Sequence, residues 1–237
     1  MFAVFKREFL SYFKTPAGYV FMAMFLAVNG GVFSIFTLQA QDGDLSSYFM
    51  TMTFAFVVLI PILTMKSFSE ERKTKTEQLL LTSPTTLGGI VFGKFLAALT
   101  LLVLTYLVGC VNYTALYKFA AEDKPNTAAI VGCSVALILI GAAFIAIGIF
   151  VSALTENQLI SALGTMGIMV LFLVVGMLNQ YIPYNWLKTA LSWLSIYSRF
   201  SNFTYGIFDF AAVLYYVSIS FVFLFLTVRI YERRRWA

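Results

Sequence analysis

The sequence contains no histidine and only two cysteines. The absence of histidine excludes histidine-based acid–base chemistry, histidine-ligated haem and the common zinc sites. Cys110 and Cys133 both lie within apolar stretches, and no CxxC motif joins them. We therefore interpret both cysteines as small apolar packing residues rather than a redox pair, and we expect no metal site.

Charge is also scarce, because Asp, Glu, Lys and Arg make up only 11% of the 237 residues whereas hydrophobic residues make up 60%. The mean hydropathy is +0.86. A soluble domain of this size cannot bury so much apolar surface, which predicts a polytopic membrane protein. The apolar runs are continuous over about 20 residues instead of alternating over about 10, which favours an all-α bundle over a barrel.

Six apolar runs are each long enough to cross a hydrocarbon core of about 30 Å. They cover residues 17–38, 47–65, 89–117, 127–152, 158–178 and 209–230. We predict that these spans form one transmembrane domain over residues 1–237. Residues 179–208 carry Trp and Tyr among polar residues, so we predict one or two short helices that lie on, or dip into, the outer leaflet.

Basic residues are unevenly distributed along the predicted spans. Twelve of the sixteen Lys and Arg fall on one side of a six-span topology, including both chain ends and the 66–88 loop. The positive-inside rule then places both termini and this loop in the cytoplasm of a multi-pass plasma-membrane protein. The net charge of +5 is thus a topology signal, and we expect no nucleic-acid partner.

The N-terminal segment precedes the first span and repeats phenylalanine at helical spacing, while cations lie between the rings. This pattern predicts an interfacial helix over residues 1–15 on the cytoplasmic leaflet. Pro16 then starts the first span. An ordinary basic flank is the alternative. The residues that characterise the interfacial helix are Phe5, Lys6, Arg7, Glu8 and Phe9.

The 66–88 loop concentrates charge between two apolar spans. Glu70 and Glu71 suit a helix N-terminus, and Lys73 could pair with Glu77 four residues later. The leucines at 79–81 offer an apolar face, and Pro84 would end the helix. We predict a short amphipathic helix over about 70–82 that docks a soluble partner; a solvated connecting loop is the alternative.

The segment Gly88 to Phe95 matches the spacing of a phosphate-binding loop, but Phe95 occupies the position of the magnesium-binding hydroxyl. We therefore expect no nucleotide site and no enzyme activity on this chain. Gly89, Gly93 and Ala97 instead predict close helix packing, and Lys94 is expected to reach the aqueous interface. Further small residues mark similar faces: Gly141, Ala142, Ala146, Gly148, Gly164 and Gly167.

The spans carry no charge near their centres, which argues against an ion relay and for an external energy source. Asp209, at the outer start of the last span, comes closest. The polar residues within spans are mild, and most of them are expected to form helix–helix hydrogen bonds. They include Asn29, Thr100, Thr105, Asn112, Ser134 and Thr165.

Residues 65–73, Thr76 and residues 79–84 together resemble the cytoplasmic loop of ABC-2-type transporter permeases. The similarity is greatest to the branch containing the gliding-motility permease GldF and the nitrous-oxide-reductase accessory permease NosY. Shorter matches follow in the same order along nearly the whole chain, from residues 5–9 to residues 232–236. Lys75 stands where the family usually has a glycine.

The resemblance implies six membrane helices, an N-terminal interfacial helix and a cytoplasmic coupling helix. It implies that a second permease copy or paralogue and two separate ABC ATPase subunits, which hold ATP and Mg, complete an exporter. This chain itself needs no cofactor, and an auxiliary extracytoplasmic subunit is a further expected partner. A non-transporting membrane scaffold is the alternative function. The ATPase-coupling residues implied are Glu70, Glu71, Arg72, Lys73, Thr76, Glu77, Leu79, Leu80, Thr82 and Pro84, with a second contact at Glu156 and Asn157.

Overall fold

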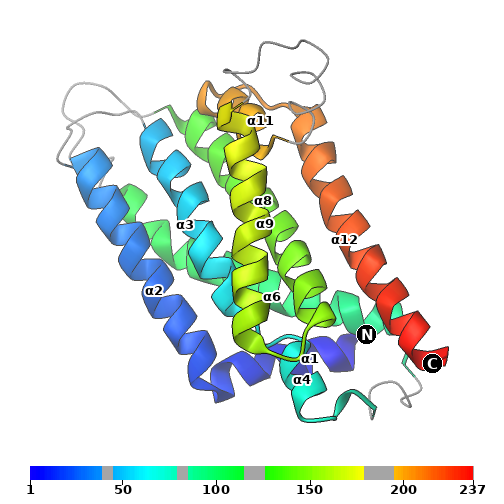
Figure 1. The fold of residues 1–237 in the computed structure, drawn as a ribbon. Helices are drawn as coiled ribbons and strands as arrows, with labels where there is room; N and C mark the ends of the chain where they lie inside the picture. Colours follow the sequence, from blue (N-terminus) through cyan, green and yellow to red (C-terminus); the bar gives the residue numbers. More distant parts are fainter. Residues whose placement is uncertain (39–44, 79–84, 115–125, 179–194, 237) are drawn as a thin grey trace.

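The long apolar runs form long helices in the computed structural model of the chain, which describes residues 1–38, 45–78, 85–114, 126–178 and 195–236 (Figure 1). Over these residues the regular structure is entirely helical, which confirms the predicted all-α class. The elements are α1 (Phe2–Lys14), α2 (Pro16–Phe33) with its π-helical extension η1 (Ser34–Leu38), α3 (Ser46–Thr64), α4 (Ser69–Lys73), α6 (Leu87–Gly109), α8 (Thr127–Leu154), α9 (Gln158–Leu178), α11 (Ile196–Thr204) and α12 (Phe210–Trp236).

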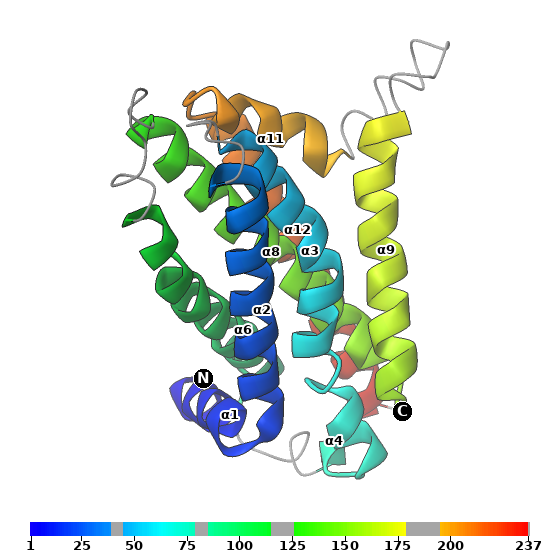
Figure 2. The same ribbon diagram turned by 90° about the vertical axis from the view of Figure 1, so that its left-hand side faces the viewer.

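Six stretches of the described chain are long and apolar enough to cross a membrane, as the sequence predicts. They are Pro16–Phe36, Ser46–Lys73, Leu87–Thr114, Thr127–Leu154, Gln158–Gly176 and Phe210–Arg235. Their helices run side by side in a bundle, and α8 is the central one, because it packs against α3, α6, α9, α11 and α12 (Figures 1 and 2).

Local signals set where the helices begin. Pro16 opens α2, a position where its missing N–H costs nothing. The Thr86 hydroxyl accepts a hydrogen bond from the Gly89 N–H at the start of α6. The Asn126 side chain accepts hydrogen bonds from two backbone N–H groups at the start of α8. These caps satisfy donors that the first helical turn leaves free.

Helix α1 lies across one end of the bundle and packs closely on α6 (Figure 1). A Cβ atom on Gly93 would lie 3.1 Å from Val4 Cγ1 and 3.3 Å from the Phe5 backbone nitrogen. The small face predicted around Gly93 therefore serves contact between α1 and α6. The rings of Phe5, Phe9 and Phe13 follow one another along α1, with centroids 5.8 Å and 5.1 Å apart.

Helix α11 crosses the opposite end of the bundle and supplies a helix within the region 179–208; residues 179–194 lie outside the described chain (Figure 1). The Tyr216 hydroxyl donates to the Ile196 carbonyl over 3.0 Å. Asp209 caps α12 by accepting from the N–H groups of Ala211 and Ala212. A hydrogen bond from Asn202 lowers the pKa of Asp209.

Polar side chains within the spans divide into two groups. Asn112 donates to Asn29 over 2.7 Å, and Asn29 donates to the Tyr48 hydroxyl over 2.8 Å. Tyr106 donates to Ser134 over 2.7 Å. These bonds between helices confirm the predicted role of Asn29, Asn112 and Ser134.

The same prediction is wrong for the threonines. Thr100, Thr105 and Thr165 each donate to the backbone carbonyl four residues earlier in their own helix. A threonine hydroxyl can always reach that carbonyl without help from a neighbour, so it needs no partner on a second helix.

Close approach between α3 and α8 makes Gly148 a stringent test of the packing. A Cβ there would lie 2.8 Å from Thr64 Cβ, whereas a Cβ on Gly167 of α9 meets no described atom within 4 Å. We predict that Gly148→Ala lowers the free energy of unfolding by about 1–3 kcal/mol through overpacking. Gly167→Ala should leave it unchanged or raise it by up to about 1 kcal/mol. Unfolding of the purified variants in detergent measures both; equal stability of the two would contradict this packing.

Candidate functional site at the charged end

One end of the bundle brings together charged segments that are far apart in the sequence. Helix α1, helix α4, the 155–157 loop between α8 and α9, and the last turns of α12 all lie there (Figures 1 and 2). We call this region the charged end. It contains the residues that the sequence singles out for coupling, apart from Leu79, Leu80, Thr82 and Pro84, which lie outside the described residues.

Helix α4 has only five residues and is held at its start by a side chain from α8. The Ser152 hydroxyl accepts hydrogen bonds from the backbone N–H groups of Phe68 and Ser69 over 3.0 Å and 3.1 Å. Ser152 is fully buried. Ser152, 83 positions away from Ser69, thus provides the N-terminal cap that the residues next to α4 do not supply. These hydrogen bonds also fix α4 to the central helix.

Arg72 makes a second connection between α4 and α8. Its Nε pairs with Glu156 Oε1 over 2.9 Å, and its Nη1 donates to the Leu154 carbonyl over 2.8 Å at the end of α8. A cation at a helix C-terminus interacts favourably with the unpaired carbonyls there. Asn157 has a local role, because its side chain accepts from the Leu159 N–H and caps α9.

Four charged residues, Arg7, Glu8, Glu71 and Lys94, form what we call the four-charge cluster. Lys94 Nζ lies 2.9 Å from Glu71 Oε1 and 3.1 Å from Glu8 Oε1, and it also donates to the Ser67 carbonyl over 2.8 Å. Arg7 pairs with the same two carboxylates over 2.6 Å and 3.2 Å. The cluster joins α1, α4 and α6.

The environment of Lys94 differs from the prediction. The side chain was expected to reach the aqueous interface, but it is only 2% exposed. Lys94 lies within the predicted third span, and its charge stays buried there instead of reaching water. The physical reason is that α1 folds back over the start of α6 and presents Glu8, so that two carboxylates replace water around the ammonium group.

The charges of the four-charge cluster balance. Burial raises the pKa of Glu8, but the charge of Lys94 and hydrogen bonds from Arg7 and Lys94 outweigh this effect, and the net pKa is lowered. Burial lowers the pKa of Arg7, but its pairing with Glu8 and Glu71 outweighs burial, and the net pKa is raised. Arg7 therefore stays charged. Burial raises the pKa of Glu71, and its pairing with Lys94 and Arg7 opposes that rise without cancelling it. In this half-buried site the loss of one cation would leave the carboxylates uncompensated.

Helix α12 completes the charged end. Arg234 pairs with Glu77 over 3.1 Å and donates to the Ala153 carbonyl over 2.8 Å. The rings of Phe68 and Tyr231 lie 4.8 Å apart. The predicted pair between Lys73 and Glu77 is wrong, because Glu77 turns toward α12 while Lys73 is exposed.

The docking helix predicted over 70–82 is interrupted. Helix α4 ends at Lys73, residues 74–76 form a turn, and helical structure resumes at residue 77. Lys75 has φ 59°, in the left-handed region that favours glycine. This is the position where the resembling family usually has glycine, so the turn that the glycine permits is formed here by a lysine.

The predicted coupling residues divide by exposure. Glu70, Lys73 and Thr76 are exposed, as are Thr74 and Lys75 between them. Other members, including Glu71, Arg72 and Glu77, are turned into the fold and bind α1, α6, α8 or α12. On α1, Lys6 is exposed, whereas Arg7 and Glu8 belong to the four-charge cluster.

Sequence reasoning missed Ser152 and Arg234 as partners of the loop and misplaced Lys94. A lysine beside the small face of α6, together with a glutamate in the amphipathic α1, is a signal for the Glu8–Lys94 pair. The contacts of Ser152 and Arg234 carry no such local signal.

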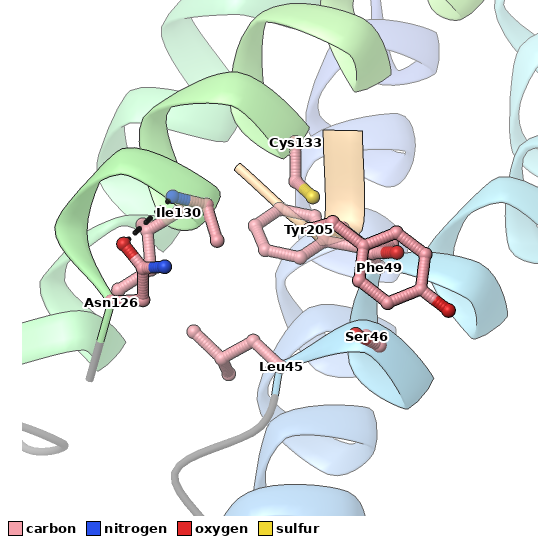
Figure 3. Close-up of a pocket in the computed structure, with 9 residues that line it drawn as sticks. Leu45, Ser46, Phe49, Asn126, Ile130, Cys133 and Tyr205 are labelled. Carbon is pink, nitrogen blue, oxygen red and sulfur yellow. Dashed lines mark hydrogen bonds between the residues drawn. The ribbon is translucent and has the colours of Figure 1, made fainter. Parts of the chain in front are cut away.

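A cavity of about 380 Å³ lies at the other end of the bundle, between α3, α8 and the end of α11 (Figure 3). Figure 3 shows Phe49, Cys133 and Tyr205 gathered at this cavity. None of the nine residues that line it is charged. Among the described residues, the ion pairs that connect different helices lie at the charged end rather than at this cavity.

Comparison with known families identifies the chain. The sequence model described as "ABC-2 family transporter protein" matches residues 18–236, which is nearly the whole chain. None of the curated proteins compared with the chain matches it.

The four-charge cluster can be tested by removing its buried cation. Lys94→Met leaves Glu8 and Glu71 without their closest partner, and we predict a loss of about 3–5 kcal/mol in the free energy of unfolding at neutral pH. Lys6→Met removes an exposed cation at the same end of the bundle, and it should change the free energy of unfolding by less than about 0.5 kcal/mol.

The pH dependence of the stability difference between Lys94→Met and the wild type provides a second test. The lowered pKa of Glu8 means that its pairing stabilises the wild type above the usual carboxyl pKa and that this contribution is lost as pH falls through the lowered value. In Lys94→Met, acid neutralises the unpaired carboxylates, so the deficit relative to wild type should shrink toward about pH 4. A deficit that stays constant over this range would refute the role of the cluster.

Proposed function

The chain belongs to the ABC-2 family of transporter proteins, and from this premise we propose that it is the permease subunit of an exporter driven by a separate ATPase. Members of this family are transmembrane subunits rather than ATPases and associate with ABC ATPase subunits. We propose that the charged end faces the cytoplasm of the cell that carries it in its plasma membrane, and that the ATPase docks on the loop of residues 69–84.

The observation that carries this proposal is the division of the loop into an exposed side and a bound side. Glu70, Lys73 and Lys75 offer both signs of charge to a soluble partner. Residues of the same short segment, Arg72 and Glu71, are ion-paired to the body of the bundle. A segment that is exposed on one side and ion-paired to the bundle on the other can transmit a displacement from a bound partner to the helices.

The hydrogen bonds and ion pairs of the loop determine which helices would receive that displacement. The loop connects α3 with α6 along the chain, and its side chains contact α8, through Ser152 and Arg72, and α12, through Glu77 and Arg234. We propose that closure of two ATPases on ATP moves α4 as a rigid body and that this shifts a two-state equilibrium of the bundle.

The energy source is proposed to lie on the partner. ATP and Mg would be held by the ATPase, and a second copy or paralogue of this chain would complete the transport path. An auxiliary subunit on the α11 side is a further proposed partner. The exposed apolar helices suit a lipidic or amphipathic cargo, which is consistent with export from the membrane.

Paired variants separate docking from coupling. We predict that Lys73→Asp lowers recovery of the ATPase with the tagged chain, because it reverses an exposed charge at the proposed interface. Glu77→Gln should leave recovery intact but reduce stimulation of the co-purified ATPase, because it breaks the tie to α12. A charge swap, Glu77→Arg with Arg234→Glu, should restore part of that stimulation.

The measurements are quantitative mass spectrometry of the complex from native membranes and ATP turnover in lipid nanodiscs. Tyr205→Phe, at the opposite end of the bundle, is the control and should match wild type in both. Recovery of the chain with no ATPase, under conditions that keep other transporters intact, would favour the alternative of a membrane scaffold. Equal behaviour of Lys73→Asp and Glu77→Gln would refute the division into docking and coupling residues.

A further inference from the structure

A second cavity, of about 660 Å³, opens at the charged end between α1, the end of α3, α4 and the start of α6. Its volume lies within the range of sites that hold small molecules. The residues that line it are Arg7, Glu8, Ser11, Tyr12, Thr15, Ala17, Ile62, Leu63, Lys66, Ser67, Glu70, Glu71, Thr76 and Lys94. Three of these residues, Glu70, Glu71 and Thr76, belong to the proposed docking loop, and the others come from α1, α2, the end of α3, the turn at residues 65–68 and α6.

The lining combines an apolar part with a charged part. Tyr12, Ala17, Ile62 and Leu63 come from the elements where α1 meets the ends of the spans α2 and α3. The charged residues come from α1, α4, α6 and the turn at Lys66. A cavity at the end of two spans whose lining contains both apolar and charged side chains matches a molecule that has a polar head and an apolar body.

The charges of the lining balance as well. Three cations, Arg7, Lys66 and Lys94, face three carboxylates, Glu8, Glu70 and Glu71. A ligand with only a negative charge would meet the carboxylates, and one with only a positive charge would meet the cations. A ligand that carries both signs, on separate groups, is favoured over either.

Two groups in the lining have hydrogen-bonding capacity that the described residues do not use. Glu71 Oε2 is buried and receives no hydrogen bond from them, since Lys94 and Arg7 both bind Oε1. Lys66 makes no ion pair within the part of the chain that the structure describes. A buried carboxylate oxygen requires a donor, and a free ammonium suits an anion such as phosphate.

We propose that this cavity binds the headgroup of a phospholipid that carries a primary ammonium, of the phosphatidylethanolamine type. The ammonium donates to Glu71 Oε2 and lies near Glu70, while the phosphate accepts from Lys66. The acyl chains leave along Tyr12, Ile62 and Leu63. A lipid bound in this way holds α1 against α4 and makes the shape of the charged end depend on the membrane around it.

Headgroup chemistry provides the test, because N-methylation removes N–H donors without changing the phosphate. The purified full-length chain is incubated with lipids of identical acyl chains that carry ethanolamine, its mono- and dimethyl forms, choline or glycerol, and retention is measured by native mass spectrometry. We expect retention to fall along the series, by about tenfold from ethanolamine to choline, as the bond to a charged acceptor is lost. Equal retention of the ethanolamine, choline and glycerol lipids would overturn the proposal.

Matched variants locate the site. Lys66→Met should weaken retention of the ethanolamine lipid by about tenfold, whereas Lys73→Met removes a cation that does not line the cavity and should have no effect. Unchanged retention in Lys66→Met would place the lipid elsewhere. Free phosphoethanolamine at the same concentration should not displace the lipid; if it does, the ligand is a soluble phosphoamine.

The assay contains no ATPase, so its outcome is independent of the proposed docking function. If Lys66→Met instead lowers ATPase recovery and leaves lipid retention unchanged, the cavity receives a side chain of the partner and the lipid proposal is wrong.

Discussion

A lysine ammonium group can be buried in an apolar bundle only if carboxylates replace the water around it, and this constraint organises the charged end. Lys94 meets the constraint by drawing Glu8 from α1 and Glu71 from α4 to the same point on α6. Because both carboxylates also bind Arg7, neither helix can leave without exposing a charge imbalance. The position of α1 across the bundle and the position of α4 beneath α3 are therefore set together.

Helix α4 carries both exposed residues and residues that are ion-paired to the bundle, because successive side chains of a helix point in different directions. Within α4 the side chains of Glu71 and Arg72 point to different parts of the bundle, while Glu70 and Lys73 remain exposed. The left-handed turn at Lys75 then redirects the chain so that Glu77 reaches α12. Residues 69–77 of the loop are thus fixed to α6, α8 and α12 by these contacts, and the proposed permease function uses this attachment.

Features that depend on nearest neighbours along the chain could be predicted from sequence. The six spans follow from continuous apolar runs, the small face of α6 follows from the spacing of Gly89 and Gly93, and the charge-rich loop is visible directly. What could not be predicted depends on tertiary packing. No local pattern indicates that Ser152 caps α4, or that Glu77 prefers Arg234, 157 residues away, to Lys73 four residues away. The resemblance marked Lys75 as a departure, but only the backbone shows that Lys75 has a positive φ, which favours glycine.

The residues that hold α4 in place are synthesised long after α4 itself. A five-residue helix is too short to form by itself, and its cap comes from Ser152 on the fourth span, while the turn that follows it is secured by Arg234 near the end of the chain. During synthesis the loop emerges long before either partner exists. It can therefore take its final shape only after the last helix has been inserted. A partner that recognises this shape distinguishes a completed subunit from an unfinished one, so assembly of the complex would act as its own quality control.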